Sequence, residues 1–167
     1  MYDYLPYASP LGRLTIAAED GAVTALVIEG QKYQARHLAG EGRERETSAL
    51  REAALWLDRY FAGERPDVSA LTLAPKGTAF QKRVWDALLD IPYGETTTYG
   101  ALALRLGSAA RAVGSAVGRN PISILIPCHR VLAADGSLAG YAGGPENKRK
   151  LLELEASKLP YRQERIS

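Results

Sequence analysis

The first half of the chain alternates between runs typical of strands and one run typical of a helix. Apolar and β-branched residues fill 13–18 and again 23–28, and Glu19-Asp20-Gly21 between them is a strong turn signal. This pattern predicts a β-hairpin. After a polar loop over 40–46, apolar residues recur at helical spacing over 49–61, so we expect an amphipathic helix there.

The second half is predicted to be mostly helical. Apolar spacing indicates helices over 79–89, 99–106 and 109–118, with Gly107 ending the second and Ser108 capping the third. Two short helices joined by a tight turn that contains glycine form a helix-turn-helix pattern.

The third of these helices consists almost entirely of small residues, and Arg111 is its one long charged side chain. Composition leaves two interpretations open. The helix is a close-packed part of the core, which is the commoner case, or it lies unusually close to a ligand backbone or in a narrow groove.

The candidate chemistry centres on the single cysteine. Cys128 follows an apolar run over 122–126 that we expect to be a buried strand, and His129 comes directly after it. A thiol becomes a nucleophile when a base or a positive charge stabilises its thiolate. An inert buried cysteine is the other interpretation. Neighbouring side chains of an extended chain point to opposite faces, so His129 reaches the thiol only if the chain turns or a water bridges them.

A carboxylate is needed to orient the second ring nitrogen of such a histidine. Pro145 suits the first position of a helix that we expect to run to Glu155. That helix offers Glu153 or Glu155 as the acceptor.

Composition sets wider bounds. The chain has 167 residues, of which 24% are charged and 46% hydrophobic, as is usual for a globular protein. One cysteine excludes an intramolecular disulfide and any multi-cysteine metal site, and it fits a reducing compartment. No apolar run approaches the ~20 residues of a membrane helix, and no signal peptide is visible at the N-terminus, so a cytoplasmic location is expected.

Charge divides the chain into two regions. Residues 1–75 hold 8 Lys/Arg against 11 Asp/Glu, a net −3, whereas residues 76–150 hold 10 against 5, a net +5. We therefore expect two domains, 1–75 and 76–167, of which the second faces an anionic partner. A chance asymmetry of a solvated surface is the alternative.

The remaining motifs are weak. The glycine-rich loop over 140–144 lacks the context of a phosphate cradle, and it is either a pocket wall with Tyr141 stacking on a flat ligand or a plain loop. His37 is interpreted as a surface histidine. No dinucleotide fingerprint or two-histidine metal spacing occurs, so neither a cofactor nor a metal is expected.

Several motifs stand in order between Gly77 and Glu155, namely Ile91-Pro92-Tyr93-Gly94-Glu95-Thr96, Ala110-Arg111-Ala112-Val113-Gly114, Arg119-Asn120-Pro121, Ile126-Pro127-Cys128-His129-Arg130-Val131 and Tyr141-Ala142-Gly143-Gly144. Their sequence and spacing closely resemble those of the 6-O-alkylguanine-DNA alkyltransferase family, the methylated-DNA–protein-cysteine S-methyltransferases. The segment Ser9-Pro10-Leu11-Gly12 also resembles the family's first domain.

The resemblance implies an α+β fold. A small N-terminal α/β domain of the ribonuclease H-like type would precede a mostly helical, winged helix-turn-helix-like domain that binds DNA and carries the active site. It further implies direct-reversal DNA repair, in which 6-O-alkylguanine is flipped from duplex DNA and its alkyl group passes irreversibly to Cys128 in a single turnover. 4-O-Alkylthymine is left open as a second substrate. The implied partner is double-stranded DNA bound through its minor groove by a monomer, with cooperative assembly on DNA left open.

By position, the resemblance makes Cys128 the alkyl acceptor, has His129 take its proton through a water, and has Glu155 orient His129. Asn120 would hold the loop around the site. Tyr141 would donate to the guanine N3 as the leaving base gains charge. The implied substrate pocket consists of Val131, Tyr141, Ala142 and Gly143.

The resemblance also gives the small-residue helix a role, because it places that helix in the minor groove, where little sequence is read. Arg111 would fill the hole left by the flipped base, and Tyr99 would crowd the phosphate. The residues that would allow close approach are Ala109, Ala110, Ala112, Gly114 and Ser115.

The sequence departs from the family's pattern at two places. Some relatives bind zinc in the first domain through Cys and His, but here only His37 lies in that half. Ala142 stands where relatives often have a serine.

Three other functions are disfavoured. Cys128 argues against a lesion binder that does not react. The scarcity of base-reading side chains argues against a helix-turn-helix regulator, and the lack of an amide-hydrolysing arrangement argues against a cysteine hydrolase.

Overall fold

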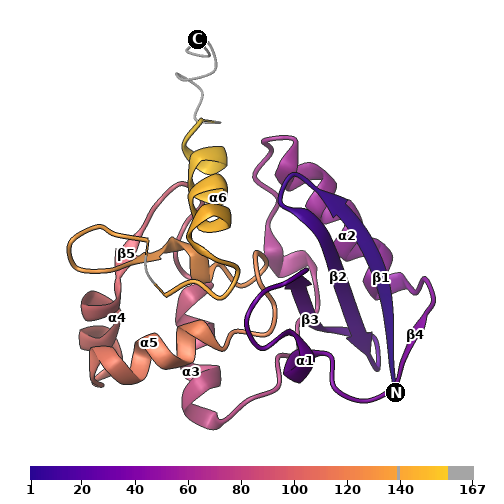
Figure 1. Ribbon diagram of the computed structural model, residues 1–167, viewed down its shortest axis with the longest axis horizontal. Coiled ribbons are helices and arrows are strands. Elements are labelled where there is room, and N and C mark those ends of the chain that lie inside the picture. The colour runs from indigo at the N-terminus through magenta and orange to yellow at the C-terminus, as the bar shows by residue number, and fades with distance from the viewer. Residues whose placement is uncertain (139, 158–167) are drawn as a thin grey trace. The chain divides into compact units, whose positions relative to one another are not determined.

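A computed structural model describes residues 1–138 and 140–157 of the chain. It separates into two compact units (Figure 1). The first comprises Met1–Lys76 together with Pro121–Leu125, and the second comprises Gly77–Asn120 and the residues from Ile126 onward. The part of the expected second domain beyond residue 157 lies outside the described residues. None of the described helices is both long and apolar enough to cross a membrane.

The first unit is built on a four-stranded sheet in the order β3-β2-β1-β4. Its strands are β1 (Tyr2–Ser9), β2 (Gly12–Glu19), β3 (Ala22–Ile28) and β4 (Gly42–Glu44). The hairpin expected from 13–18 and 23–28 is confirmed as the antiparallel pair β2–β3. Sequence patterning missed β1, which is half-buried along most of its length and therefore shows no apolar alternation.

Helices complete this unit. The expected helix over 49–61 is α2 (Ser48–Phe61), and its N-cap is Thr47, whose side chain accepts from the Leu50 backbone N–H. It packs across the sheet through its buried face (Figure 1). The short α1 (Gln34–His37) and the 3-10 helix η1 (Val68–Ala70) lie in the connections.

His37, expected at the surface, is half-buried at the end of α1, and burial lowers its pKa. Its Nε2 atom is buried without a hydrogen-bond partner in the described structure. The ring instead lies edge-on to Tyr33, with 6.4 Å between centroids. His37 is thus partly exposed, with one ring nitrogen buried, rather than a fully solvated surface histidine.

The expected strand over 122–126 is also wrong. Only Ile122 forms a bridge, to Leu26 of β3, and Ile124 has a left-handed backbone with φ of 71°. A β-branched residue in that conformation turns the chain out of any ladder. The run is nevertheless buried throughout, which is why it resembled a core strand.

The second unit is mostly helical, as expected. Its helices are α3 (Ala79–Leu88), α4 (Tyr99–Leu106), α5 (Ala110–Gly118), η2 (Cys128–Arg130) and α6 (Pro145–Ser157), and a short parallel pair joins β5 (Thr97–Thr98) to β6 (Val131–Leu132). The α4–α5 pair forms the helix-turn-helix, with Gly107 in the left-handed conformation that ends α4. Ser108 does not cap α5, because Ala109 occupies the N-cap position and no side chain caps this helix.

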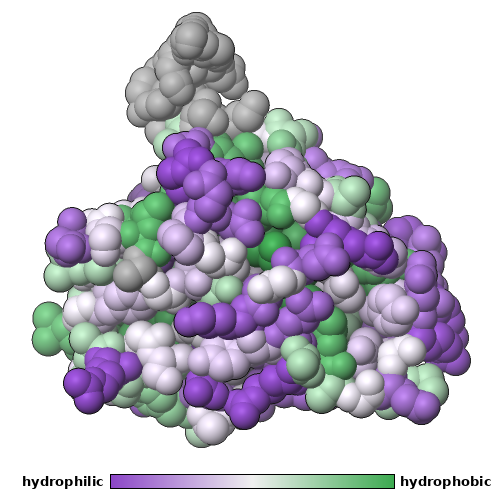
Figure 2. Space-filling view, in the orientation of Figure 1, coloured by the Kyte–Doolittle hydropathy of each residue, from purple (hydrophilic) through white to green (hydrophobic). Residues whose placement is uncertain are grey.

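Exposed large apolar side chains of the described part are few and separate. They are Met1, Tyr33, Leu55 and Leu104. On the face drawn in Figure 2, apolar residues lie in small areas among polar ones. Such scattered residues are usual for protein surfaces and do not by themselves mark an interface.

The space available for a Cβ atom at two glycines gives a first prediction, which concerns stability. A Cβ at Gly77 would lie 2.4 Å from the ring of the buried Trp85, so Gly77→Ala should lower the free energy of unfolding by about 1–3 kcal/mol through overpacking. The matched control is Gly100→Ala on α4, where a Cβ meets nothing within 4 Å and should raise that free energy by about 0.5–1 kcal/mol. Urea unfolding measures the free energy of unfolding of both variants. Equal changes in Gly77→Ala and Gly100→Ala would contradict the prediction.

Candidate active site

Cys128 lies where the chain turns rather than at the end of a strand. It opens the 3-10 helix η2, in which the Arg130 N–H donates to the Pro127 carbonyl over 3.0 Å. The thiol is buried, with 3% of the residue exposed. The chain therefore turns at Cys128, and the opposite-face alternation of an extended segment does not apply to Cys128 and His129.

Asn120 fixes the approach to this turn. It is 1% exposed, and its Nδ2 donates to the Ile126 carbonyl over 2.9 Å. The same side chain hydrogen-bonds the Cys128 thiol and lowers its pKa. The amide therefore acts on the loop, as the resemblance implies, and also on the sulfur itself.

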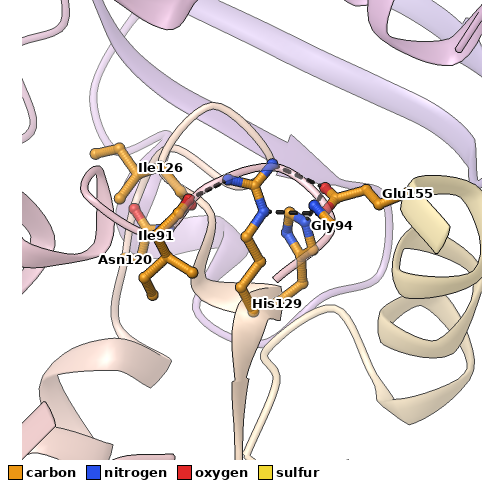
Figure 3. Close-up of polar contacts among 7 residues, drawn as sticks. Ile91, Gly94, Asn120, Ile126, His129 and Glu155 are labelled. Carbon is orange, nitrogen blue, oxygen red and sulfur yellow. Dashed lines mark hydrogen bonds and ion pairs between the residues drawn. The ribbon is translucent and has the colours of Figure 1, made fainter. Parts of the chain in front are cut away.

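Glu155 is the hub of a buried polar network (Figure 3). His129 Nε2 lies 2.7 Å from its Oε2, and Arg130 donates through Nε to Oε1 and through Nη2 to Oε2, each over 2.9 Å. The Gly94 backbone N–H also donates to Oε1, over 3.0 Å. These donors hold the pKa of the Glu155 carboxyl far below its usual range although burial opposes them.

The residue pattern left Glu153 and Glu155 open as the partner of His129, the resemblance selected Glu155, and the structure places Glu155 beside the ring. Glu153 is exposed on α6 and pairs with Arg149 over 2.6 Å. The difference follows from helical geometry, since residues two apart on a helix do not share a face.

The network sets the state of His129. Since Glu155 is ionised, Nε2 carries the proton that it shares with the carboxylate, and Nδ1 is left with its lone pair. Nδ1 is buried without a hydrogen-bond partner in the described part of the chain. Burial lowers the pKa of the ring even though Glu155 opposes this. His129 is therefore a neutral base whose accepting nitrogen remains available.

Cys128 needs such a base. Burial raises the pKa of its thiol to about 11, although the Asn120 hydrogen bond and the Lys148 charge both lower it. At neutral pH the sulfur is a thiol and must lose a proton to become a strong nucleophile. A buried thiol, a neutral histidine and a fixed carboxylate form a nucleophile, a base and an orienting group.

The loop before α6 holds three of the residues that the resemblance assigns to the substrate pocket, and their place in a pocket stays a prediction. Tyr141 is buried, and its carbonyl accepts from the Gly144 N–H over 3.0 Å. Asn147 Nδ2 donates to the Gly143 carbonyl over 2.9 Å, which ties the loop to the helix. Val131 is fully buried, whereas Ala142 and Gly143 are half-buried.

Helix α5 has one buried and one exposed face. Val113, Ala116 and Val117 are buried, so half of the helix belongs to the core. Gly114 is half-buried, and the other residues expected to face DNA are exposed, namely Ala109, Ala110, Arg111, Ala112 and Ser115. The core interpretation is therefore confirmed for the buried face, and the close approach of the exposed face to a ligand stays a prediction.

Tyr99, also expected to meet DNA, is half-buried. A Cβ at Gly140 would lie 2.4 Å from its hydroxyl oxygen, so this ring packs against the loop before Tyr141. Burial raises its pKa to about 12.

Sequence reasoning missed two cations of the site. Arg130 has no role in the sequence analysis beyond its place in the motif around Cys128. In the structure it donates to Glu155 and, through Nη1, to the Ile91 carbonyl over 2.6 Å. Lys148 lies in a Lys-Arg-Lys run that resembles a solvated helix face, yet it is fully buried. The spacing of the run gave no signal that one of its members points inward.

The residues described by the structure contain no group of three His, Cys, Asp or Glu side chains that could hold a metal ion. That neither a metal nor a cofactor is needed stays a prediction.

Comparison with known proteins matches both units. Residues 79–157 match the family model of the 6-O-methylguanine DNA methyltransferase DNA binding domain, and residues 2–75 match that of its ribonuclease-like domain. The fold thus defines an α+β protein with a ribonuclease-like domain followed by a helical DNA-binding domain. The chain belongs to the 6-O-methylguanine DNA methyltransferase family, which confirms the resemblance and the fold class inferred from its motifs.

Individual relatives are similar to this chain over most of its length. The methylated-DNA–protein-cysteine methyltransferase of Haemophilus influenzae is 46% identical over 160 residues, which cover 95% of this chain and 87% of that protein. The crystal structure of the Mycobacterium tuberculosis O6-methylguanine methyltransferase superposes with a TM-score of 0.83 at 44% identity over the whole of both chains. A structure of the M. tuberculosis protein OGT in complex with DNA has a TM-score of 0.81 at 44% identity, covering 96% of this chain and 97% of that one.

Proposed function

We propose that the protein repairs DNA by transferring an alkyl group from O6 of guanine to the sulfur of Cys128, once per molecule. The observation that carries the proposal is the buried thiol beside a neutral His129 whose Nε2 is fixed by Glu155. The names of the relatives and the DNA complex of one of them support DNA as the substrate.

The reaction balances without a cofactor. The Cys128 S–H proton passes through a bridging water to His129 Nδ1, and the sulfur attacks the alkyl carbon in line with the carbon–O6 bond. A carbon–sulfur bond forms while the carbon–oxygen bond breaks, and its electron pair leaves with guanine. The guanine then takes up a proton. The product is a stable thioether, so each molecule reacts once.

The leaving base gains charge, and the pocket contains groups suited to meet it. Tyr141 would donate from its hydroxyl to N3 of the guanine, and the backbone carbonyls of Cys128 and Val131 would accept from its exocyclic amine. Ala142 offers no side-chain donor to O6, so that contact would come from a backbone N–H of the loop. Gly143, on the same loop, would leave room for the base.

The exposed face of α5 would lie in the minor groove, where its small side chains permit close approach. A base must leave the stack before its O6 alkyl group can reach a buried sulfur. Arg111, exposed on this face, would occupy the hole in the duplex, and Tyr99 would crowd the neighbouring phosphate. The net charge of +5 over residues 76–150 favours a polyanionic partner.

One experiment tests the proposal as a whole. The protein is incubated with a duplex containing 6-O-methylguanine, and its intact mass is measured. We expect a gain of one methylene per molecule, mapped to Cys128 by peptide sequencing. Tight binding without a mass change would indicate a lesion binder, and continued turnover with excess substrate would contradict the single-reaction mechanism.

Arg111 gives the second prediction. Arg111→Ala should slow repair of duplex DNA by about tenfold or more, since losing a group that fills the stack costs a few kcal/mol. Its reaction with free benzylguanine, which needs no flipping, should be unchanged. The matched control is Arg105→Ala on α4, which removes an exposed arginine paired with Asp90 and should leave both rates unchanged. Equal losses on both substrates in Arg111→Ala would refute the role in flipping.

A further inference from the structure

Trp85 of α3 is a buried donor to which the proposed mechanism gives no task. The residue is 2% exposed, and its indole Nε1–H donates to the Ala116 carbonyl of α5 over 2.8 Å. A buried tryptophan N–H usually finds a partner, and here that partner belongs to another helix, 31 residues further along the chain. The bond therefore joins α3 to the helix whose exposed face is expected to meet DNA.

Helix α5 is weak by itself. It has nine residues, and its interior contains Gly114, which is a poor helix former. Helices this short are marginal without tertiary contacts. The structure shows no side-chain hydrogen bond at its N-cap, Ala109. The position of α5 therefore depends on what holds its buried side and its C-terminal end.

Trp85 holds that C-terminal end. Ala116 lies in the last turn of α5, where carbonyl groups lack the usual helical partner four residues on. Its carbonyl accepts from the Arg119 N–H over 3.1 Å as well as from the indole. The indole has little room to shift, because a Cβ at Gly77 would already lie 2.4 Å from its ring. The last turn of α5 is thus bonded to a rigid support.

The same helix also reaches the first half of the helix-turn-helix. Arg83, two residues before Trp85, donates through Nη2 to the Leu106 carbonyl at the end of α4 over 3.1 Å. Residues two apart on a helix do not share a face, so α3 can bond to the ends of both helices. The Arg83 bond is exposed to water, whereas the Trp85 bond is buried and is electrostatically the stronger of the two.

We propose that Trp85 is a positioning residue for duplex recognition, whose indole N–H holds the last turn of α5 and so fixes the orientation in which Arg111 meets DNA. The inference rests on the proposed function, which places the exposed face of α5 on the duplex. The site around Cys128 has supports of its own, since Asn120 bonds to the Ile126 carbonyl and to the thiol. An effect confined to duplex DNA therefore distinguishes positioning of α5 from a general loss of structure.

Trp85→Phe tests the proposal, because it removes the donor and keeps an aromatic ring. The expected effect is that of one lost hydrogen bond, about three- to tenfold weaker binding of an undamaged duplex and equally slower repair of a methylated one. The rate with free benzylguanine, which needs no contact with α5, should stay at the wild-type value. Binding isotherms and single-turnover kinetics measure these quantities.

Trp56→Phe on α2 is the matched control. Trp56 is the chain's other tryptophan and is 8% exposed, and its Nε1 has no hydrogen-bond partner in the described part of the chain. The substitution removes the same atoms without breaking such a bond, so duplex binding should be unchanged. Equal losses on duplex and benzylguanine in Trp85→Phe, wild-type duplex binding in Trp85→Phe, or the same loss of binding in Trp56→Phe would overturn the proposal.

A measurement on the wild-type protein covers the case in which Trp85→Phe fails to fold. Exchange of the two indole N–H hydrogens is followed by NMR with and without an undamaged duplex. With the duplex at about ten times its Kd, the Trp85 hydrogen should exchange about tenfold more slowly, because opening of α5 then competes with bound DNA. The Trp56 hydrogen should be unaffected. Equal changes at both indoles, or none at Trp85, would overturn the proposal, whereas a wild-type protein without affinity for DNA would refute the proposed function.

Discussion

Replacing Cys128 by alanine is expected to abolish alkyl transfer while leaving the affinity for duplex DNA unchanged. The sulfur is the atom that forms the new bond, and the buried thiol lies apart from the exposed face of α5 that would contact DNA. The side chain is small, so the cavity should cost only about 1 kcal/mol of folding free energy. Intact mass after incubation with the methylated duplex, and a DNA-binding isotherm on the same sample, measure both quantities.

Cys128→Ser is the control for this experiment. The hydroxyl fills nearly the same space, but it is a far weaker acid than a thiol, so transfer should still be lost. Methyl transfer that persists in Cys128→Ala would place the acceptor elsewhere. Loss of DNA binding together with transfer would mean that the residue is structural.

Glu155→Gln should have the largest combined effect on stability and rate. The substitution removes the charge that holds Arg130 and His129 in a nearly dry environment, where the carboxylate is 1% exposed. Breaking a buried ion pair leaves the other charge uncompensated and costs about 3–5 kcal/mol. His129 also loses the group that fixes its tautomer, and loss of general-base assistance should slow transfer by about 10²-fold or more.

Glu153→Gln provides a matched control on the same helix. Glu153 is exposed and pairs with Arg149 at the surface, so its loss should change the free energy of unfolding by less than about 1 kcal/mol and leave the transfer rate unaltered. Urea denaturation and single-turnover kinetics with free benzylguanine measure both variants. Similar changes in the free energy of unfolding and in the transfer rate of the two variants would show that the buried network around Glu155 adds nothing beyond a surface ion pair.

The sequence pattern predicted those helices and strands whose boundaries are marked by local capping or turn residues. The helix after Thr78 has a complete capping box with Gln81, and α4 ends at a left-handed Gly107, so both boundaries were readable from the sequence. The hairpin between β2 and β3 was equally clear. The motifs around Cys128 were specific enough to indicate the family, which the comparisons confirm.

Patterning failed where long-range packing decides the outcome. Ile124 is β-branched and buried, which favours a strand, yet its backbone is left-handed. Lys148 belongs to a charged run, yet it points into the core. Neither fact can be derived from neighbours in the sequence, because each depends on contacts with residues elsewhere in the chain. The residue pattern could not choose between Glu153 and Glu155 for the same reason, whereas the family resemblance selected Glu155 by its position in the motif order.

The Glu155 network has a consequence for folding kinetics. Its bond to the Gly94 N–H spans 61 residues, and Arg130 reaches the Ile91 carbonyl across 39. Contacts of such long sequence separation form after large loops have closed, and they slow folding. A partly folded chain in which α6 has not docked would therefore contain the thiol and the histidine but not the group that orients them. Reaction with benzylguanine should consequently report the native population alone, and its onset during refolding should coincide with the docking of the final helix.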